Sequence, residues 1–243
     1  MRALITGASQ GIGRATARRL AEPSTELLLH CFRHPEAAEA LAAELAARGV
    51  IASVARADLA RRSEVDRLAE ETVRRLPSLD TLILNAGSYP RVGFEEMTDA
   101  EFDDCLELNL TAPARLTRRL LPLLRRAPTG GRIVLVSSIL AFTGSRRGAH
   151  YAAAKAGLVG LARSLALELA PTVSVNVVAP GSIDTAILAS DSPERRAARV
   201  LEIPLRRIGT PEEVADAIAF LVSPAAGYLT GTTLHVNGGL FRG

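Results

Sequence analysis

The sequence predicts a three-layer α/β fold, in which a doubly wound parallel sheet of about seven strands is covered by helices on both faces. Three observations predict this fold. Short apolar segments alternate with helical segments along all 243 residues, which is typical of a parallel sheet buried on both faces. A glycine-rich turn joins the first apolar segment to the first helical segment. Small or polar residues follow most of the predicted strands, at the sheet edge where ligands bind.

The first third of the chain alternates regularly between strands and helices. We expect strands at 2–6, 26–32, 50–56 and 79–84, and helices at 14–21, 35–48 and 63–76. Pro35 at the start of a helix and Gly49 just beyond its end are typical boundary residues. Ser63, followed by an acidic first turn, is expected to cap the third helix.

The remaining chain continues the alternation around one irregular segment. We expect a Leu-rich helical region at 99–126 interrupted by Pro113, strands at 132–137, 173–178 and 232–236, and helices ending at 170 and spanning 211–222. The polar, Arg-rich segment 182–210 favours a mobile lid over a substrate, with a solvated surface helix as the alternative. No linker or repeat divides the chain, so we expect a single domain over residues 1–243.

Composition limits the function classes. Hydrophobic residues make up 48% and charged residues 23%, as in ordinary globular proteins. The net charge of +3 comes from arginines scattered among acids, and aromatics are only 4%, so no nucleic-acid partner is expected. Cys31 and Cys105 have no metal or redox spacing, so we expect buried thiols, a reducing compartment and no metal site. Without a signal-peptide core or a long apolar span, the chain is expected to be cytoplasmic, with no membrane partner.

A tyrosine and a lysine form the most informative pair. Lys155 is the only lysine among 29 lysines and arginines, which indicates that this position needs a compact ammonium. Tyr151 precedes it by four residues, so both side chains share one face of a helix. An ammonium beside a phenol lowers the pKa of the phenol, which makes it a proton donor near neutral pH. A chance pair is the alternative, since short motifs are unspecific.

The first turn has the spacing of a dinucleotide site. Gly7 permits a tight turn, Gly11 lets the backbone approach a pyrophosphate, and Gly13 allows the helix to pack on the strand. Amides at the helix start then face the phosphates. A generic turn between strand and helix is the alternative.

Six predicted strands are followed by glycine, polar or charged residues. They are Gly7 to Gly13, Arg33, Asp58, Asn85 to Gly87, Ser137-Ser138 and Pro180-Gly181. Because the carboxyl ends of parallel strands lie at one edge of the sheet, these groups converge there. Their convergence favours the catalytic interpretation of Tyr151 and Lys155.

Together these residues resemble the short-chain dehydrogenase/reductase family over the whole chain. The matching residues are Thr6 to Gly13, Asp58, Asn85-Ala86-Gly87, Asn109, Ser138, Tyr151, Lys155 and Pro180-Gly181. Within the family the chain is most similar to bacterial 3-oxoacyl-[acyl-carrier-protein] reductases, on the segments 151–158, 175–181, 203–209 and 229–239. Those segments are more specific for the family than for the substrate.

The resemblance implies a Rossmann fold and a catalytic role for four residues. Tyr151 would donate a proton to a carbonyl oxygen, and Lys155 would lower its pKa and hold the nicotinamide ribose. Ser138 would stabilise the developing charge, with Ser137 as the alternative. Asn109 would hold a water that relays protons to Lys155, or it satisfies local backbone instead.

The resemblance also implies a set of cofactor contacts. They are Gly7, Ser9, Gln10, Gly11, Ile12, Gly13, Arg33, Asp58, Leu59, Asn85, Ala86, Gly87, Tyr151, Lys155, Pro180, Gly181, Ile183 and Thr185. Arg33 stands where an acid would bind the ribose of NAD, so we expect NADPH (NADP+) to be favoured over NADH. Many NADPH-binding relatives have a second base where this chain has Gln10. Asp58 would accept from the adenine amine, while 85–87 lines the adenosine or forms a simple turn.

The leading functional hypothesis is NADPH-dependent reduction of a 3-oxoacyl thioester carried on acyl carrier protein. Arg125 and Arg126 would receive that acidic partner, although 170–172 lacks a base that relatives often have there. The alternatives are a dehydrogenase of a free small alcohol, sugar or quinone, and a non-catalytic dinucleotide-binding regulator. The helix after Tyr151 is apolar almost all round, which favours two-fold pairing, and the resemblance implies a homotetramer.

Overall fold

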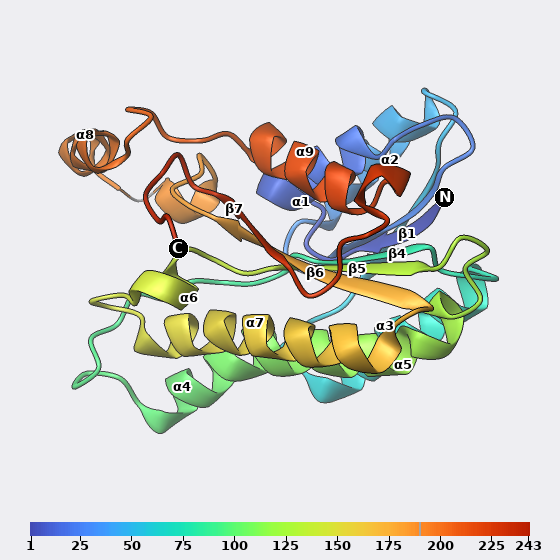
Figure 1. The fold of residues 1–243 in the computed structure, drawn as a ribbon, viewed down its shortest axis with the longest axis horizontal. Helices are drawn as coiled ribbons and strands as arrows, with labels where there is room; N and C mark the ends of the chain where they lie inside the picture. The colour runs from blue at the N-terminus through green and yellow to red at the C-terminus, as the bar shows by residue number, and fades with distance from the viewer. Residues whose placement is uncertain (190) are drawn as a thin grey trace.

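The computed structural model describes residues 1–189 and 191–243. Its strands form one parallel sheet in the order β3-β2-β1-β4-β5-β6-β7. Helices cover both faces of this sheet, which gives three layers (Figure 1). The predicted fold class, a doubly wound sheet of seven strands, is confirmed. None of the helices in the described ranges combines the length and apolar character needed to cross a membrane.

The strand order reverses direction at one place in the sheet. The strands are β1 (Arg2–Ile5), β2 (Glu26–Cys31), β3 (Ile51–Arg56), β4 (Thr81–Leu84), β5 (Gly131–Val136), β6 (Val173–Pro180) and β7 (Thr233–Val236). From β1 the chain adds β2 and β3 on one side, and then returns to place β4 on the other side of β1. Crossover connections therefore leave in opposite directions from this point, which is where a ligand crevice forms in such sheets.

The helices divide between the two faces. Above the sheet in Figure 1 lie α1 (Gly11–Arg19), α2 (Pro35–Ala46) and α9 (Pro211–Leu221), and below it lie α3 (Arg62–Arg75), α4 (Asp99–Leu106), α5 (Ala112–Leu124) and α7 (Ala149–Leu169). The short α6 (Leu140–Thr143) and α8 (Pro193–Glu202) lie toward the edge where the strands end. A π-helix (Glu107–Thr111) joins α4 to α5, and two single 3₁₀ turns occupy Ala186–Leu188 and Pro224–Ala226.

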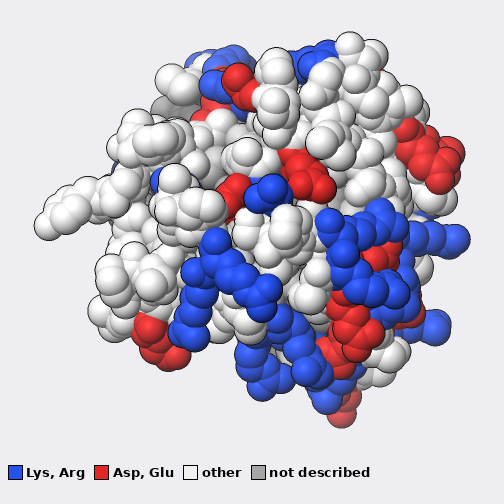
Figure 2. Space-filling model, turned by 90° about the vertical axis from the view of Figure 1, so that its right-hand side faces the viewer, with Lys and Arg blue, Asp and Glu red and all other residues white. Residues whose placement is uncertain are grey.

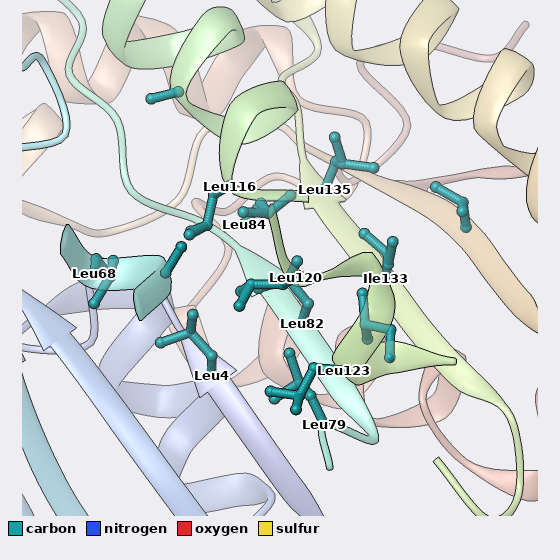
Figure 3. Close-up of a cluster of buried hydrophobic side chains, with 14 of the residues drawn as sticks. Leu4, Leu68, Leu79, Leu82, Leu84, Leu116, Leu120, Leu123, Ile133 and Leu135 are labelled. Carbon is teal, nitrogen blue, oxygen red and sulfur yellow. The ribbon is translucent and has the colours of Figure 1, made fainter. Parts of the chain in front are cut away.

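Alternate strand residues bury into two cores, one on each face. Leu4 and Leu82 pack with Leu120 of α5 on the lower face (Figure 3). Their neighbours Ile5 and Ile83 pack instead against α1, α2 and α9 on the upper face. Each fully buried leucine or isoleucine contributes roughly 1.5–3 kcal/mol, so both faces fix the position of the strand ends.

Two local predictions need correction or refinement, and a third agrees with the structure. Ser63 is not the N-cap of α3, because the helix begins at Arg62 and Arg61 takes the extended cap position. Pro113 follows soon after the π-helix at 107–111, and the backbone stays helical through Thr111 and Ala112. Its missing N–H therefore falls inside a continuous helical run, where the hydrogen-bond pattern changes but the helix does not end. Cys31 and Cys105 are free and buried, as predicted.

Candidate active site

A cavity of about 190 Å³ opens where the strands end, close to the reversal of strand order. It brings together residues from strands and loops that are far apart in the sequence. The predicted residues that line it are Ile12, Asn85, Gly87, Ser137, Ser138, Tyr151, Lys155, Pro180, Gly181, Ile183 and Thr185. The edge of the sheet therefore brings Ser138, Tyr151 and Lys155 together with part of the predicted cofactor set in one pocket, whose lining does not include Asn109.

Tyr151 lies in the first turn of α7 with only 7% of its surface exposed. Ser138, whose Oγ accepts from the Leu140 backbone N–H at 3.1 Å, lines the same cavity. Burial raises the pKa of Tyr151, and this effect outweighs the opposing effect of the Ser138 side chain. The phenol therefore keeps its proton at neutral pH.

Lys155 follows one helical turn later and is buried. Its Nζ donates to the Val136 carbonyl at 2.9 Å and lies 5.6 Å from the centre of the Tyr151 ring. Burial lowers the pKa of Lys155 to about 8. The prediction that Lys155 lowers the pKa of Tyr151 is wrong in this structure, because desolvation of the phenol is the dominant effect on its pKa.

The two neighbouring serines have different contacts. Ser137 Oγ donates to the backbone carbonyl of Lys155 at 2.7 Å, so it ties the end of β5 to α7. Ser138 instead faces the Tyr151 hydroxyl. Of the two hydroxyls, Ser138 is therefore the one placed to bind a carbonyl oxygen beside Tyr151.

Asn109 lies within the π-helix and is fully buried. Its Nδ2 donates to the carbonyls of Ser88 and Cys105 at 3.1 and 3.0 Å, whereas its Oδ1 has no partner among the described residues. A Cβ placed on Gly87 would lie 2.6 Å from this Oδ1 and 3.4 Å from Lys155 Nζ, so both polar atoms face the same backbone position. An unpartnered acceptor beside an amine suits a bridging water.

The glycine turn is tightly packed against the start of α1. A Cβ on Gly13 would lie 2.2 Å from the Gly7 carbonyl oxygen, so no larger residue fits. Gly11 has a φ of +53°, which favours glycine. The first amides of α1 therefore reach the sheet edge unobstructed, and this arrangement fits the pyrophosphate of a dinucleotide.

His30 braces this turn and was missed by the sequence reasoning. Its Nδ1 accepts from the Gly7 N–H at 3.1 Å, and its Nε2 pairs with the Ala57 carbonyl at 3.0 Å. Since the Ala57 carbonyl can only accept, the proton resides on Nε2. Burial lowers the pKa of His30 to about 4. The sequence signal that could have indicated His30 is its position among the apolar residues 27–32 of a predicted strand.

Asn85 is a second brace. Its Nδ2 donates to the carbonyls of Thr6 and Gly7 at 2.9 and 3.2 Å, and the backbone N–H groups of Asn85 and Ala86 donate to Thr6 Oγ1. This side chain therefore joins the end of β4 to the glycine turn. Its amide is occupied by backbone, which supports the turn interpretation of 85–87.

The remaining predicted cofactor residues do not line the cavity around Tyr151. They are Gly7, Ser9, Gln10, Gly11, Gly13, Arg33, Asp58, Leu59 and Ala86. Arg33 is exposed beyond β2, and none of the ion pairs in the described ranges involves it. Asp58 Oδ1 accepts from the Ala60 N–H at 3.1 Å. Leu59 buries its side chain in the lower core, so only its backbone is available to a ligand.

The other end of the cavity contains residues that the sequence did not predict. Tyr89, from the loop after β4, places its ring 4.6 Å from the Tyr151 ring, and its hydroxyl lies 2.6 Å from Ser145 Oγ. Arg91 from the same loop and Arg199 from α8 also line this end. None of these residues belongs to the predicted cofactor set, and we assign this end of the cavity to the substrate.

The family comparison covers almost the whole chain. A family model described as Enoyl-(Acyl carrier protein) reductase matches residues 7–241. Nodulation protein G of Rhizobium sp. (strain N33) is 44% identical over 98% of this chain and 96% of its own. The 3-oxoacyl-[acyl-carrier-protein] reductase FabG of Staphylococcus aureus (strain Mu50 / ATCC 700699) is 38% identical over 98% and 97%.

Solved structures agree with this assignment. A short chain dehydrogenase from Burkholderia cenocepacia J2315 in complex with NADP is 32% identical and covers 98% of this chain and 97% of its own, with a TM-score of 0.91. The match therefore extends from the glycine turn to the last strand. The chain belongs to the short-chain dehydrogenase/reductase family of oxidoreductases.

Proposed function

We propose that the protein reduces a 3-oxoacyl thioester to the 3-hydroxyacyl thioester with NADPH. The observation that carries this proposal is that the side chains of Ser138, Tyr151 and Lys155 line one cavity at the ends of the strands. Two hydroxyl donors converge there on the position that a ketone oxygen would take. The similarity to a 3-oxoacyl-[acyl-carrier-protein] reductase supports the thioester as substrate.

The described side chains account for the proton chemistry. Reduced nicotinamide, when bound, supplies the hydride. Tyr151 donates its proton to the ketone oxygen, while Ser138 donates a hydrogen bond to the same oxygen as negative charge develops. The raised pKa of Tyr151 keeps this proton available for reduction at neutral pH. Lys155 holds the ribose hydroxyls, and the Asn109 Oδ1 holds a water that returns a proton to the site.

NADPH preference rests on Arg33. Its guanidinium is exposed directly after β2, where a ribose 2′-phosphate would lie, and no acid occurs between the end of the strand and Glu36. The NADP complex of the Burkholderia relative is consistent with this choice. Comparing turnover with NADPH and NADH tests it, and a clear preference for NADH would contradict the assignment.

We propose acyl carrier protein as the partner that delivers the thioester. Arg125 and Arg126 are exposed at the end of α5, on the edge where the strands begin. Figure 2 shows this end of the molecule, with basic side chains gathered over its lower half. The cavity lies at the opposite edge of the sheet. A carrier held by these arginines would therefore serve the cavity of a neighbouring copy.

We further propose a homotetramer built through α7. Within one chain α4 and the π-helix cover part of this helix, and Leu110 packs where a Cβ of Gly157 would lie. Leu167, near the end of α7, remains 85% exposed. A second copy of α7 related by a two-fold axis is the simplest cover for it.

Acetoacetyl thioester reduction by the wild type and by Tyr151→Phe tests the reaction. We expect turnover by the wild type and a loss of about 10²–10⁴-fold in the variant, because the proton donor is removed. Absence of thioester reduction together with turnover of a free ketone would favour a dehydrogenase of small alcohols, sugars or quinones. Equal rates for both proteins would remove the catalytic assignment and favour a dinucleotide-binding regulator.

A further inference from the structure

A buried carboxylate holds two arginines at the substrate end of the cavity. The Asp191 side chain has no exposed surface, and it accepts from Arg91 Nη1 at 2.7 Å and from Arg199 Nε at 2.6 Å. Arg195 Nε lies 3.4 Å from Asp191 Oδ1 but is mostly exposed. Asp191 therefore connects the loop after β4 to α8, and it fixes one guanidinium from each.

The two arginines differ in the donors that remain available. Arg91 lies 5.4 Å from the centre of the Tyr89 ring, and its Nη2 donates to the Ile187 carbonyl at 3.4 Å. Arg199 gives only its Nε to Asp191, and its two terminal amino groups have no hydrogen-bond partner in the described part of the chain. Arg199 lines the same cavity as Tyr151 and Ser138. Arg199 therefore brings to the cavity wall N–H donors that the described residues leave unpaired.

The charges at this wall do not balance. Three arginines surround one carboxylate, and no aspartate or glutamate is among the described residues that line the cavity. An apolar-walled cavity with an excess of one sign of charge attracts ligands of the opposite sign. A guanidinium fork matches the two oxygens of a carboxylate or a phosphate.

We propose that Arg199 binds an anionic group of the substrate while Ser138 and Tyr151 bind its ketone. Asp191 is the positioning residue that orients Arg199, and Arg91 completes the wall. This inference rests on the proposed function and narrows its substrate class to 3-oxoacyl thioesters that carry a phosphate or a carboxylate. The phosphate would belong to a phosphopantetheine arm, and the carboxylate to the far end of the acyl chain.

The test compares three thioesters of the same 3-oxo group. They are an uncharged N-acetylcysteamine thioester, a phosphopantetheine thioester, and an N-acetylcysteamine thioester whose acyl chain ends in a carboxylate. We expect the wild type to prefer one charged thioester, and Arg199→Gln to raise its KM about tenfold or more, as for the loss of one charge-assisted hydrogen bond. The KM for the uncharged thioester should stay unchanged. Arg118→Gln, which removes an exposed arginine of α5 that lies outside the cavity lining and the Asp191 cluster, is the control and should keep the preference.

Asp191→Asn separates positioning from charge alone. The substitution makes the wall more positive, so simple electrostatic attraction predicts tighter binding of the charged thioester. Loss of orientation predicts a higher KM for that thioester, and this is the result we expect. We also expect Arg199→Lys to retain part of the preference for the charged thioester that Arg199→Gln loses. The preferred thioester identifies the source of the anion.

The outcomes distinguish this inference from the proposed function. If the wild type and Arg199→Gln reduce all three thioesters with the same relative KM values, the inference is overturned and the proposed function still stands. Reduction of none of them would overturn the proposed function itself.

Discussion

Lys155 meets two requirements that arginine cannot meet together. It is buried, and its single Nζ reaches the Val136 carbonyl while it faces the space beside Gly87 and Asn109. A guanidinium is larger, planar and always charged. Position 155 therefore requires lysine for its size and for its ability to titrate, which explains why a chain so rich in arginine retains one ammonium there.

The pKa of Lys155 predicts the alkaline limit of activity. Because burial lowers this pKa to about 8, the amine is charged below that pH and neutral above it. We expect kcat/KM for ketone reduction to fall as the pH rises through about 8. The pKa of Tyr151 is raised, so the proton donor does not limit this range. A profile that stays flat from neutral to alkaline pH, with full saturation by NADPH, would contradict this assignment of the charged amine.

His30 predicts the acid sensitivity of the fold. Its pKa is about 4 in the folded chain and 6.5 for an unperturbed histidine, so the unfolded chain binds the additional proton between these values. Stability contributed by the neutral imidazole is complete above the higher value and is lost as the pH falls toward the lower one. The loss is about 3 kcal/mol at most.

The measurement is urea unfolding as a function of pH. His30→Leu should flatten the acid part of the stability curve. It should also lower the free energy of unfolding at neutral pH by about 1–3 kcal/mol for each backbone group left unpaired, namely the Gly7 N–H and the Ala57 carbonyl. An unchanged acid slope in His30→Leu would show that another group is responsible.

At the scale of elements, α1 acts as a unit with the glycine turn. Gly13→Ala places a methyl group 2.2 Å from the Gly7 carbonyl oxygen, so α1 must shift away from the turn. We expect at least a tenfold weaker NADPH affinity and a loss of stability of about 1–3 kcal/mol, as for an overpacked core. Fluorescence titration with NADPH and chemical unfolding measure the two effects.

Gly160→Ala is the matched control for this variant. Gly160 lies in α7 with no atom within 4 Å of the added methyl group, so NADPH affinity should not change. Equal affinities in Gly13→Ala and the wild type would show that the start of α1 does not form the dinucleotide site.

The elements that could be predicted from sequence are those with a local cause. Strands such as β4 and β5 are short apolar segments with both faces buried, and α2 starts at Pro35 and ends before Gly49. The π-helix at 107–111 has only the following Pro113 as a local signal, and its position depends on contacts with α4, α5 and α7 in the folded chain. The sequence was sufficient to predict Asn109 as a site residue, but it could not predict that the Asn109 Oδ1 would be buried without a hydrogen-bond partner among the described residues.

Site residues that depend on tertiary contacts could not be predicted. Tyr89 gains its place from ring packing on Tyr151, and Arg199 from a carboxylate eight residues earlier in the chain. The pKa of Tyr151 was predicted with the wrong direction because sequence spacing shows a neighbouring charge but does not show desolvation. Burial is a property of the folded chain as a whole.

At the scale of the whole molecule, the exposed end of α7 predicts assembly. Sedimentation of the wild type should show a tetramer if Leu167 is covered by another copy. Leu167→Glu should shift the population to smaller species, because a charge would be buried in an apolar contact. Leu201→Glu, at an exposed position of α8, should leave the assembly unchanged. A monomeric wild type would remove both the tetramer and the delivery of a carrier to a neighbouring cavity.

The solitary ammonium at position 155 also makes the protein selective toward chemical labelling. Acylating reagents that react with side-chain amines have one target in this chain, and it lines the candidate active-site cavity. The rate of acylation at that position therefore reports how often the cavity opens to reagent. Slower acylation in the presence of NADP+ would show, without any turnover, that the dinucleotide occupies the space in front of Lys155.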